Sequence, residues 1–181
     1  MGHATFTCGN LTAVIGDNDA HDEHRAGYNG IFSLTSSEEA DNLFVPAYAG
    51  LNLEHIYDGY EMDRSLIFEP RQAPMRFEQI SENEALLHQP PTPHFGLESW
   101  TRFRLNEPCY IDFEFKCSPR KAVYHYGYIG LFWASYINAP HNKSIYFMST
   151  LPARGGAEGG GALAPTLHAT AQRRKHCLIR R

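Results

Sequence analysis

Side chains able to do chemistry are concentrated between His88 and Trp100, in the run HQPPTPHFGLESW. A histidine together with a carboxylate can perform general acid–base chemistry near neutral pH, so His94 and Glu98 are candidate catalytic residues. An indole ring can stack on a sugar face, and apolar platforms with polar rims are typical of small-molecule sites, so Trp100 is a candidate binding residue. The alternative is that His94 and Glu98 are ordinary surface residues and that Trp100 covers a sheet face.

Three further polar residues lie in apolar or aromatic surroundings. Glu54 and His55 follow the apolar residues of GLNLEH, and His125 lies in the aromatic run YHYGY. All three are candidate binding residues that could line a site opposite His94 and Glu98. The alternative is that the neighbouring aromatic residues pack in a core, as aromatic side chains mostly do between two sheets.

The segment DNDAHDEH, from Asp17 to His24, is rich in metal-ligand residue types. It departs from the EF-hand pattern because His21 stands where Asp or Asn is needed and Asp22 stands in place of the glycine. The four cysteines have no zinc-type spacing. We therefore interpret the segment as a solvated acidic loop and assign neither a metal site nor a cofactor to the chain. The alternative is a metal-binding protein that uses Asp17–His24, with His21 and His24 as ligands of a transition metal.

Hydrophobic periodicity predicts an all-β fold. Helical spacing of apolar residues is nearly absent, and short runs of β-branched, aromatic and leucine residues are interrupted by Gly, Pro, Asn or Asp every 8–12 residues. That pattern is typical of an antiparallel β-sandwich or barrel. We expect an antiparallel β-sandwich over residues 1–150, followed by a disordered tail.

The clearest unit is a hairpin over Ser99–Cys117. A register in which paired residue numbers sum to 216 places Phe103 opposite Phe113 and Arg102 opposite Glu114. The same register places Trp100 opposite Lys116, so both faces of the hairpin are matched. A slip by one residue would move Phe113 to the charged face, and the register is therefore strongly specified.

Other strands are expected on the same grounds. A second hairpin is predicted over Pro74–Gln89, and a third pairs Tyr128–Ile137, a central strand covered on both faces, with Ser144–Met148. Single strands are predicted at five places, namely Leu11–Ile15, Ile31–Thr35, Leu43–Val45, Leu51–Ile56 and Leu66–Glu69.

The composition changes near Thr150. All 23 aromatic residues precede this point, and residues 151–181 contain six Lys and Arg, one Glu, five Gly and six Ala. So little side-chain surface cannot offset the entropy of ordering the chain, and we expect a disordered Gly/Ala/Arg-rich tail. The tail has three interpretations: a change of reading frame near residues 148–151, a basic segment that binds an anionic partner, or a linker. A frame change would make residues 1–150 the truncated front of a longer, incomplete sandwich.

Charge and hydropathy exclude several classes of protein. The net charge of −4 and the scarcity of aromatic residues among basic ones argue against nucleic-acid binding. No apolar run approaches the ~18 residues of a membrane helix, and no secretory leader pattern is visible in the first 30 residues. We therefore expect a cytoplasmic protein with free thiols and no membrane partner.

The runs NLFVPAYAGLNLEH (42–55), ESWTRF (98–103) and FWASYINAP (132–140) resemble an uncharacterised family of bacterial proteins. The resemblance covers residues 3–149, and members of that family are longer than this chain. The density of strands and the scattered His and Glu residues are also loosely similar to galactose-mutarotase-like sandwiches. That likeness implies a supersandwich with a histidine acid and a glutamate base on a concave sheet, but it assigns neither role to a particular residue here.

The sequence thus predicts a carbohydrate-binding or carbohydrate-processing β-sandwich whose partner is a small carbohydrate. Its candidate surface comprises His94, Glu98, Trp100, Glu54, His55 and His125. The alternative is a non-catalytic interaction or structural β domain whose aromatic residues all lie in the core.

Overall fold

The computed structural model describes residues 2–139, 141, 146–148 and 163–165. The described chain is all-β with antiparallel sheets, which confirms the predicted fold class. Its strands are β1 (His3–Cys8), β2 (Leu11–Gly16), β3 (Gly30–Ser36), β4 (Asn52–Tyr57), β5 (Arg76–Ser81), β6 (Glu84–Gln89), β7 (Leu97–Asn106), β8 (Tyr110–Pro119), β9 (Gly130–Ala134), β10 (Tyr146–Met148) and β11 (Leu163–Pro165). Two single-turn helices, α1 (Arg64–Ile67) and α2 (Glu69–Gln72), follow β4.

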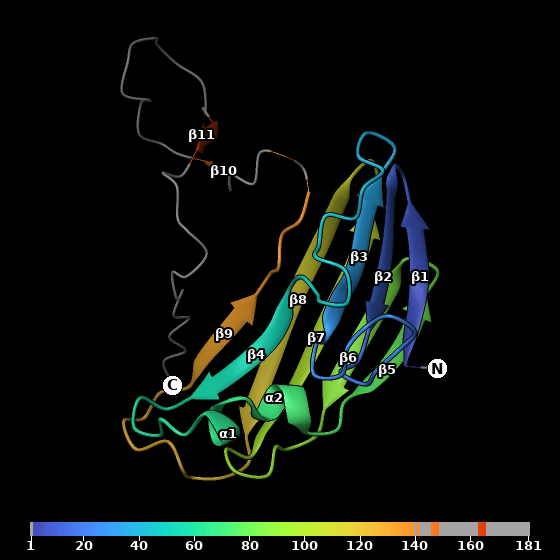
Figure 1. Cartoon of the computed structure of the whole chain (residues 1–181). Helices are drawn as coiled ribbons and strands as arrows, with labels where there is room; N and C mark the ends of the chain where they lie inside the picture. Colours follow the sequence, from blue (N-terminus) through green and yellow to red (C-terminus); the bar gives the residue numbers. More distant parts are fainter. Residues whose placement is uncertain (1, 140, 142–145, 149–162, 166–181) are drawn as a thin grey trace.

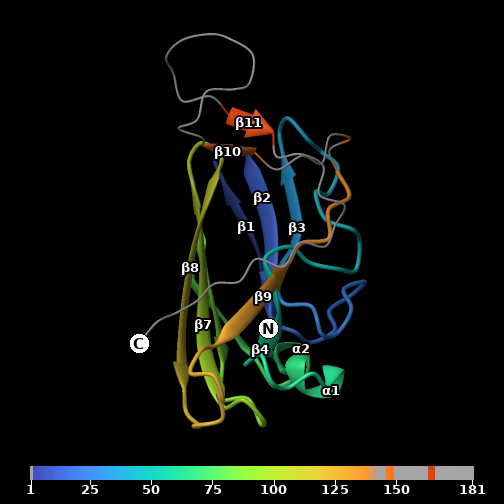
Figure 2. The ribbon, with the colours of Figure 1, turned by 90° about the vertical axis from the view of Figure 1, so that its left-hand side faces the viewer.

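The larger sheets form two layers (Figure 1). One layer is the four-stranded sheet β5-β6-β7-β8. The other layer comprises the sheet β1-β2-β3 and the pair β4-β9 (Figure 2). Two apolar clusters fill the space between the layers. The first joins Phe6 and Ile15 to Leu87 and Phe103, and the second joins residues of β4 and β9 to β7. Burial of these side chains holds the layers together, because it is the dominant favourable contribution to folding.

The predicted hairpin over Ser99–Cys117 is confirmed, including its register. β7 pairs with β8 so that Phe103 faces Phe113, Arg102 faces Glu114 and Trp100 faces Lys116. The alternation of apolar and charged residues in both strands therefore determines which face is buried.

The predicted hairpin over Pro74–Gln89 is also confirmed, as β5 paired with β6. β6 in turn pairs with β7, so the two hairpins form one sheet. This second pairing places His88 directly opposite Trp100. The order of strands therefore places the two ends of the run from His88 to Trp100 side by side on one sheet.

The strand predicted at Leu66–Glu69 is wrong, because this segment is helical. The Asp63 carboxylate accepts a hydrogen bond from the Ser65 backbone N–H at the start of α1. Pro70 occupies the first turn of α2, where proline costs little because its missing N–H would have no helical partner. Capping therefore favours helical turns over a strand.

The predicted pairing of Tyr128–Ile137 with Ser144–Met148 is wrong. β9 pairs with β4, and β10 pairs with β11. Within the described residues β9 has a single strand neighbour, so it is not central. Its apolar residues are nonetheless covered on both sides: Trp133 packs on Phe113 and Phe115 of β8, and Phe132 stacks on His55, whose ring also contacts Phe68. Trp133 is thus covered by β8, and Phe132 packs on its cross-strand neighbour His55, which Phe68 covers in turn.

Smaller differences between the predicted and the observed strands occur near the N-terminus, at Leu43–Val45 and in the tail. β1 was not predicted, and within Leu43–Val45 only Phe44 forms a β-bridge, with Ile137. Of the tail predicted at 151–181 the structure describes Leu163–Pro165, which form β11, and the remainder lies outside the described residues. Cys8 and Cys109 are free thiols, as predicted.

Candidate functional site

The outer face of β7 carries the side chains most suited to binding. Alternation along the strand buries Phe103 and Leu105 between the layers and turns Glu98, Trp100 and Arg102 outward. Trp100 is only partly buried on this outward face. The face therefore presents an indole ring among charged groups.

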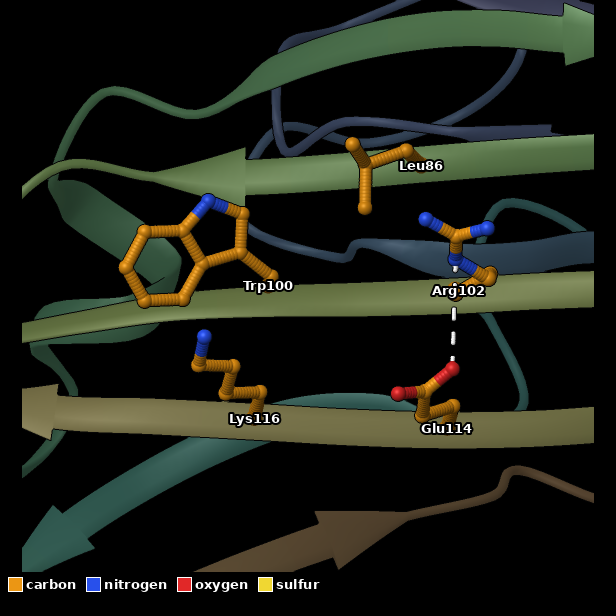
Figure 3. Close-up of a pocket in the computed structure, with 5 residues that line it drawn as sticks. All are labelled: Leu86, Trp100, Arg102, Glu114 and Lys116. Carbon is orange, nitrogen blue, oxygen red and sulfur yellow. Dashed lines mark ion pairs between the residues drawn. The ribbon is translucent and has the colours of Figure 1, made fainter.

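Neighbouring strands hold the indole of Trp100 in place. The His88 ring of β6 stacks against it with ring centroids 5.3 Å apart and an interplanar angle of 10°. From β8, the Lys116 ammonium lies 5.4 Å from the centroid of the indole, within range for a cation–π contact. A shallow hollow of about 290 Å³ beside this ring is lined by Leu86, Trp100, Arg102, Glu114 and Lys116 (Figure 3).

Glu98 is the fixed carboxylate of this face. Its Oε1 accepts a hydrogen bond from His88 Nε2 at 3.0 Å, and its Oε2 accepts one from Arg120 Nε at 2.7 Å. The bond from His88, followed by that from Arg120, holds the pKa of the Glu98 carboxyl below its ordinary value. Glu98 is therefore ionised at neutral pH and acts as a hydrogen-bond acceptor rather than a proton donor.

A second carboxylate fixes the arginines further along β7. The Glu84 carboxylate of β6 forms ion pairs with Arg102 at 2.5 Å and with Arg104 at 2.8 Å. Hydrogen bonding from Arg104 is the main interaction that lowers the pKa of Glu84, although burial acts in the opposite direction. Arg102 also lies 4.0 Å from Glu114, the pair marked in Figure 3. The charged side chains are thus held in defined positions.

The predicted catalytic pair, His94 and Glu98, does not come together. The backbone N–H of His94 donates to the Glu69 carboxylate, and its ring packs edge-on against Phe95. Glu98 instead contacts His88 and Arg120. His88, and not His94, is the histidine that is paired with Glu98.

Glu54 and His55 lie on β4, in the other layer. The Glu54 carboxylate is buried and accepts hydrogen bonds from Arg71 at 3.2 Å and from the Tyr136 hydroxyl at 2.9 Å. Burial, with the Glu54 charge second, raises the pKa of Tyr136 above its ordinary value, so the phenol stays protonated. The His55 ring packs between Phe68 and Phe132. Both residues therefore contact side chains of this layer and of the helical segment.

His125 lies in the exposed segment between β8 and β9, with its ring 4.5 Å from that of Tyr60. Of the six predicted site residues, Glu98 and Trp100 therefore share one face, and the other four lie elsewhere.

The alternative prediction, that all aromatic residues lie in the core, is wrong, because Tyr60, Tyr110 and Tyr126 are more than 60% exposed. The candidate site is the outer face of β6, β7 and β8.

Three residues of this face, His88, Lys116 and Arg120, were not among the predicted site residues. The signal for Lys116 was present in the predicted register, which places it opposite Trp100. His88 required one further step: joining the two predicted hairpins through β6 and β7 places it on the other side of the indole.

Within the described residues, no group of three or more His, Cys, Asp or Glu side chains, in the acidic loop of Asp17–His24 or elsewhere, has an arrangement that could hold a metal ion. His21 Nε2 is paired with Asp17 Oδ1 at 2.8 Å, and the His3 and His21 rings lie 4.6 Å apart. The buried His24 ring stacks on Phe32, and its Nε2 lies 2.6 Å from the Tyr28 carbonyl oxygen. The loop therefore gathers histidines near the end of the β1-β2-β3 sheet.

This histidine group predicts a loss of stability in acid. Burial lowers the pKa of His24 below 6.5; His21 and His3 act in the same direction, and the Tyr28 carbonyl and Asp17 oppose them. Because the unfolded chain then binds the proton more readily, the contribution of His24 is complete above pH 6.5 and is lost as the pH falls through the native pKa. Guanidinium chloride denaturation between about pH 8 and pH 5 measures this loss.

We expect His24→Gln to flatten that pH dependence, and His125→Gln, which alters an exposed ring, to leave it unchanged. A protein whose stability increases as the pH falls below 6.5 would contradict this account of His24.

Comparisons of the chain with family models, with curated proteins and with solved structures returned no match. The resemblances drawn from the sequence therefore stay predictions. Within the described residues, no helix has the length and apolar character needed to cross a bilayer.

Proposed function

We propose that this protein binds a carbohydrate on the outer face of β6, β7 and β8. The observation that carries the proposal is the Trp100 indole, which lies on an open sheet face between His88 and Lys116. An aromatic ring offers a sugar the apolar surface on which its C–H groups can pack, while surrounding polar groups provide orientation.

The charged neighbours of Trp100 suit hydroxyl recognition. The ionised Glu98 accepts hydrogen bonds, and the arginines and Lys116 donate them. Ion pairs already hold Glu98, Arg120 and Arg102 in position, so binding would order few additional side chains. Preorganisation of this kind supports the proposal of a binding site.

The proposal is limited to binding and includes no bond cleavage. General acid catalysis needs a group that is protonated at the working pH. Glu98 is held ionised by His88 and Arg120, and His94 is oriented by Glu69 and Phe95. The predicted acid–base pair therefore gains no support from the geometry.

The test is calorimetric titration of the full chain with a panel of neutral and acidic trisaccharides. We expect Trp100→Ala to weaken binding about 30-fold, the loss typical of a tryptophan at the centre of an interface, and Trp100→Phe to retain part of the affinity.

Tyr110→Ala is the matched control. Tyr110 is an exposed aromatic residue on the same face, six positions along β8 from Lys116 and thus about 20 Å away. Its loss should leave affinity unchanged. Equal affinities of the Trp100→Ala variant and the unaltered chain, or no binding to any trisaccharide, would overturn the proposal.

A further inference from the structure

Four side chains form a straight row across the outer face of the four-stranded sheet. Arg76 of β5 is opposite His88, His88 is opposite Trp100, and Trp100 is opposite Lys116 of β8. Residues directly opposite in antiparallel strands point to the same face. The row therefore places two stacked rings in the middle and one cation at each end.

The cations at the ends of this row differ from the other cations nearby. Arg102 and Arg104 are paired with Glu84, and Arg120 is paired with Glu98. Among the described residues, Arg76 and Lys116 have no ion pair, and both are exposed. Two unpaired positive charges thus flank the ring platform.

We propose that the carbohydrate is an acidic oligosaccharide whose carboxylates pair with Arg76 and Lys116 while a sugar ring packs on Trp100. This inference rests on the proposed function. The backbones of Arg76 and Lys116 are three strand spacings apart, or about 14 Å, so a ligand that contacts both must be longer than a single sugar ring. A uronic-acid oligosaccharide has both the apolar sugar faces and the spaced carboxylates.

The neighbouring rows disfavour a nucleic acid as the ligand. The next row carries Glu78 and Glu114 at its two ends, and Asp112 lies in the row beyond. A nucleic acid carries a phosphate at every nucleotide and would bring some of them close to these carboxylates. A saccharide with charges at intervals can place neutral hydroxyls there instead.

The test compares trigalacturonate with its methyl ester, which has the same sugar backbone without the charges. We expect the double variant Arg76→Gln/Lys116→Gln to bind trigalacturonate about 10-fold more weakly and to lose most of the preference for the acid over the ester. The salt dependence of trigalacturonate binding should decrease in the same variant.

The matched control is Arg25→Gln/Arg64→Gln, which removes two positive charges away from the four-stranded sheet. It should leave both affinities unchanged. Equal binding of the acid and the ester, or an unaltered affinity of the Arg76→Gln/Lys116→Gln variant, would overturn the acidic ligand. The proposed function would still stand if Trp100→Ala abolished binding of the ester.

Oligouridylate is included as a competitor. Displacement of trigalacturonate by oligouridylate at lower concentration would assign the face to single-stranded nucleic acid and overturn both proposals. No binding of the acid, the ester or the neutral panel would end the proposed function itself.

Discussion

Replacement of Phe103 by alanine is expected to lower the free energy of unfolding by about 4 kcal/mol. Phe103 has no exposed surface and lies on the inner face of β7, in the cluster that joins the two layers. Truncation of the ring removes its burial and leaves a cavity between β7 and the β1-β2-β3 sheet, which can collapse only in part. Guanidinium chloride denaturation of the Phe103→Ala variant and of the unaltered chain measures the difference in unfolding free energy.

Phe113 provides a matched control, because it is the residue directly opposite Phe103 in the register and the two rings are 5.7 Å apart. Phe113 is 40% exposed, at the edge of the same sheet. Its replacement by alanine should cost about 1 kcal/mol, since less apolar surface leaves contact with protein. Similar losses for the two variants would show that the core does not lie between the layers as described.

Replacement of Asn29 by alanine is expected to lower the free energy of unfolding by about 3 kcal/mol. The buried Asn29 side chain donates to the Asn52 side-chain oxygen at 3.0 Å and to the Leu53 carbonyl at 2.9 Å, and it accepts from the Leu53 N–H at 3.1 Å. Alanine leaves these buried partners unsatisfied, and each such group costs about 1–3 kcal/mol. These bonds tie the residue before β3 to the start of β4, so denaturation should show a large loss.

A double-mutant cycle with Asn52→Ala separates this contact from general damage. Asn52 and Asn29 share a hydrogen bond. The loss of unfolding free energy in the double variant should therefore be smaller than the sum of the two single losses, and the difference should exceed about 0.5 kcal/mol. Additive losses would contradict a direct role for the pair. Asn83, in the half-buried turn between β5 and β6, is the matched control. Its replacement by alanine should lower the free energy of unfolding by only about 1 kcal/mol.

The register of β7 and β8 could be predicted because the information is local. Each strand alternates, and a single register matches aromatic residues on one face and opposite charges on the other. The position of β9 could not be predicted in this way. A continuous apolar strand can be central in a sheet, or it can lie at an edge and be covered by another sheet, here by Phe113 and Phe115 of β8, which pack on Trp133. Local sequence does not distinguish these two arrangements.

The site was predictable in part for the same reason. Glu98 and Trp100 are two residues apart on one strand and therefore share a face. Glu54 was expected to face a ligand, but Arg71 and Tyr136, which are 17 and 82 residues away in the chain, hold its carboxylate. Such distant partners follow from the packing of α2 and of the segment after β9, and the pattern of one strand does not reveal them.

Chemical-shift mapping locates the carbohydrate that we propose to contact Trp100. Nitrogen-15-labelled protein is titrated with trigalacturonate and then with maltotriose as a neutral probe. If a sugar ring packs on Trp100, its indole N–H and the backbone amides around His88 and Lys116 shift with the acidic probe. The Trp133 indole, packed on Phe113 and Phe115 at the inner side of β8, should not shift. Shifts confined to β4, β9 or the surroundings of Arg71, or no shift with either probe, would rule out a carbohydrate site at Trp100.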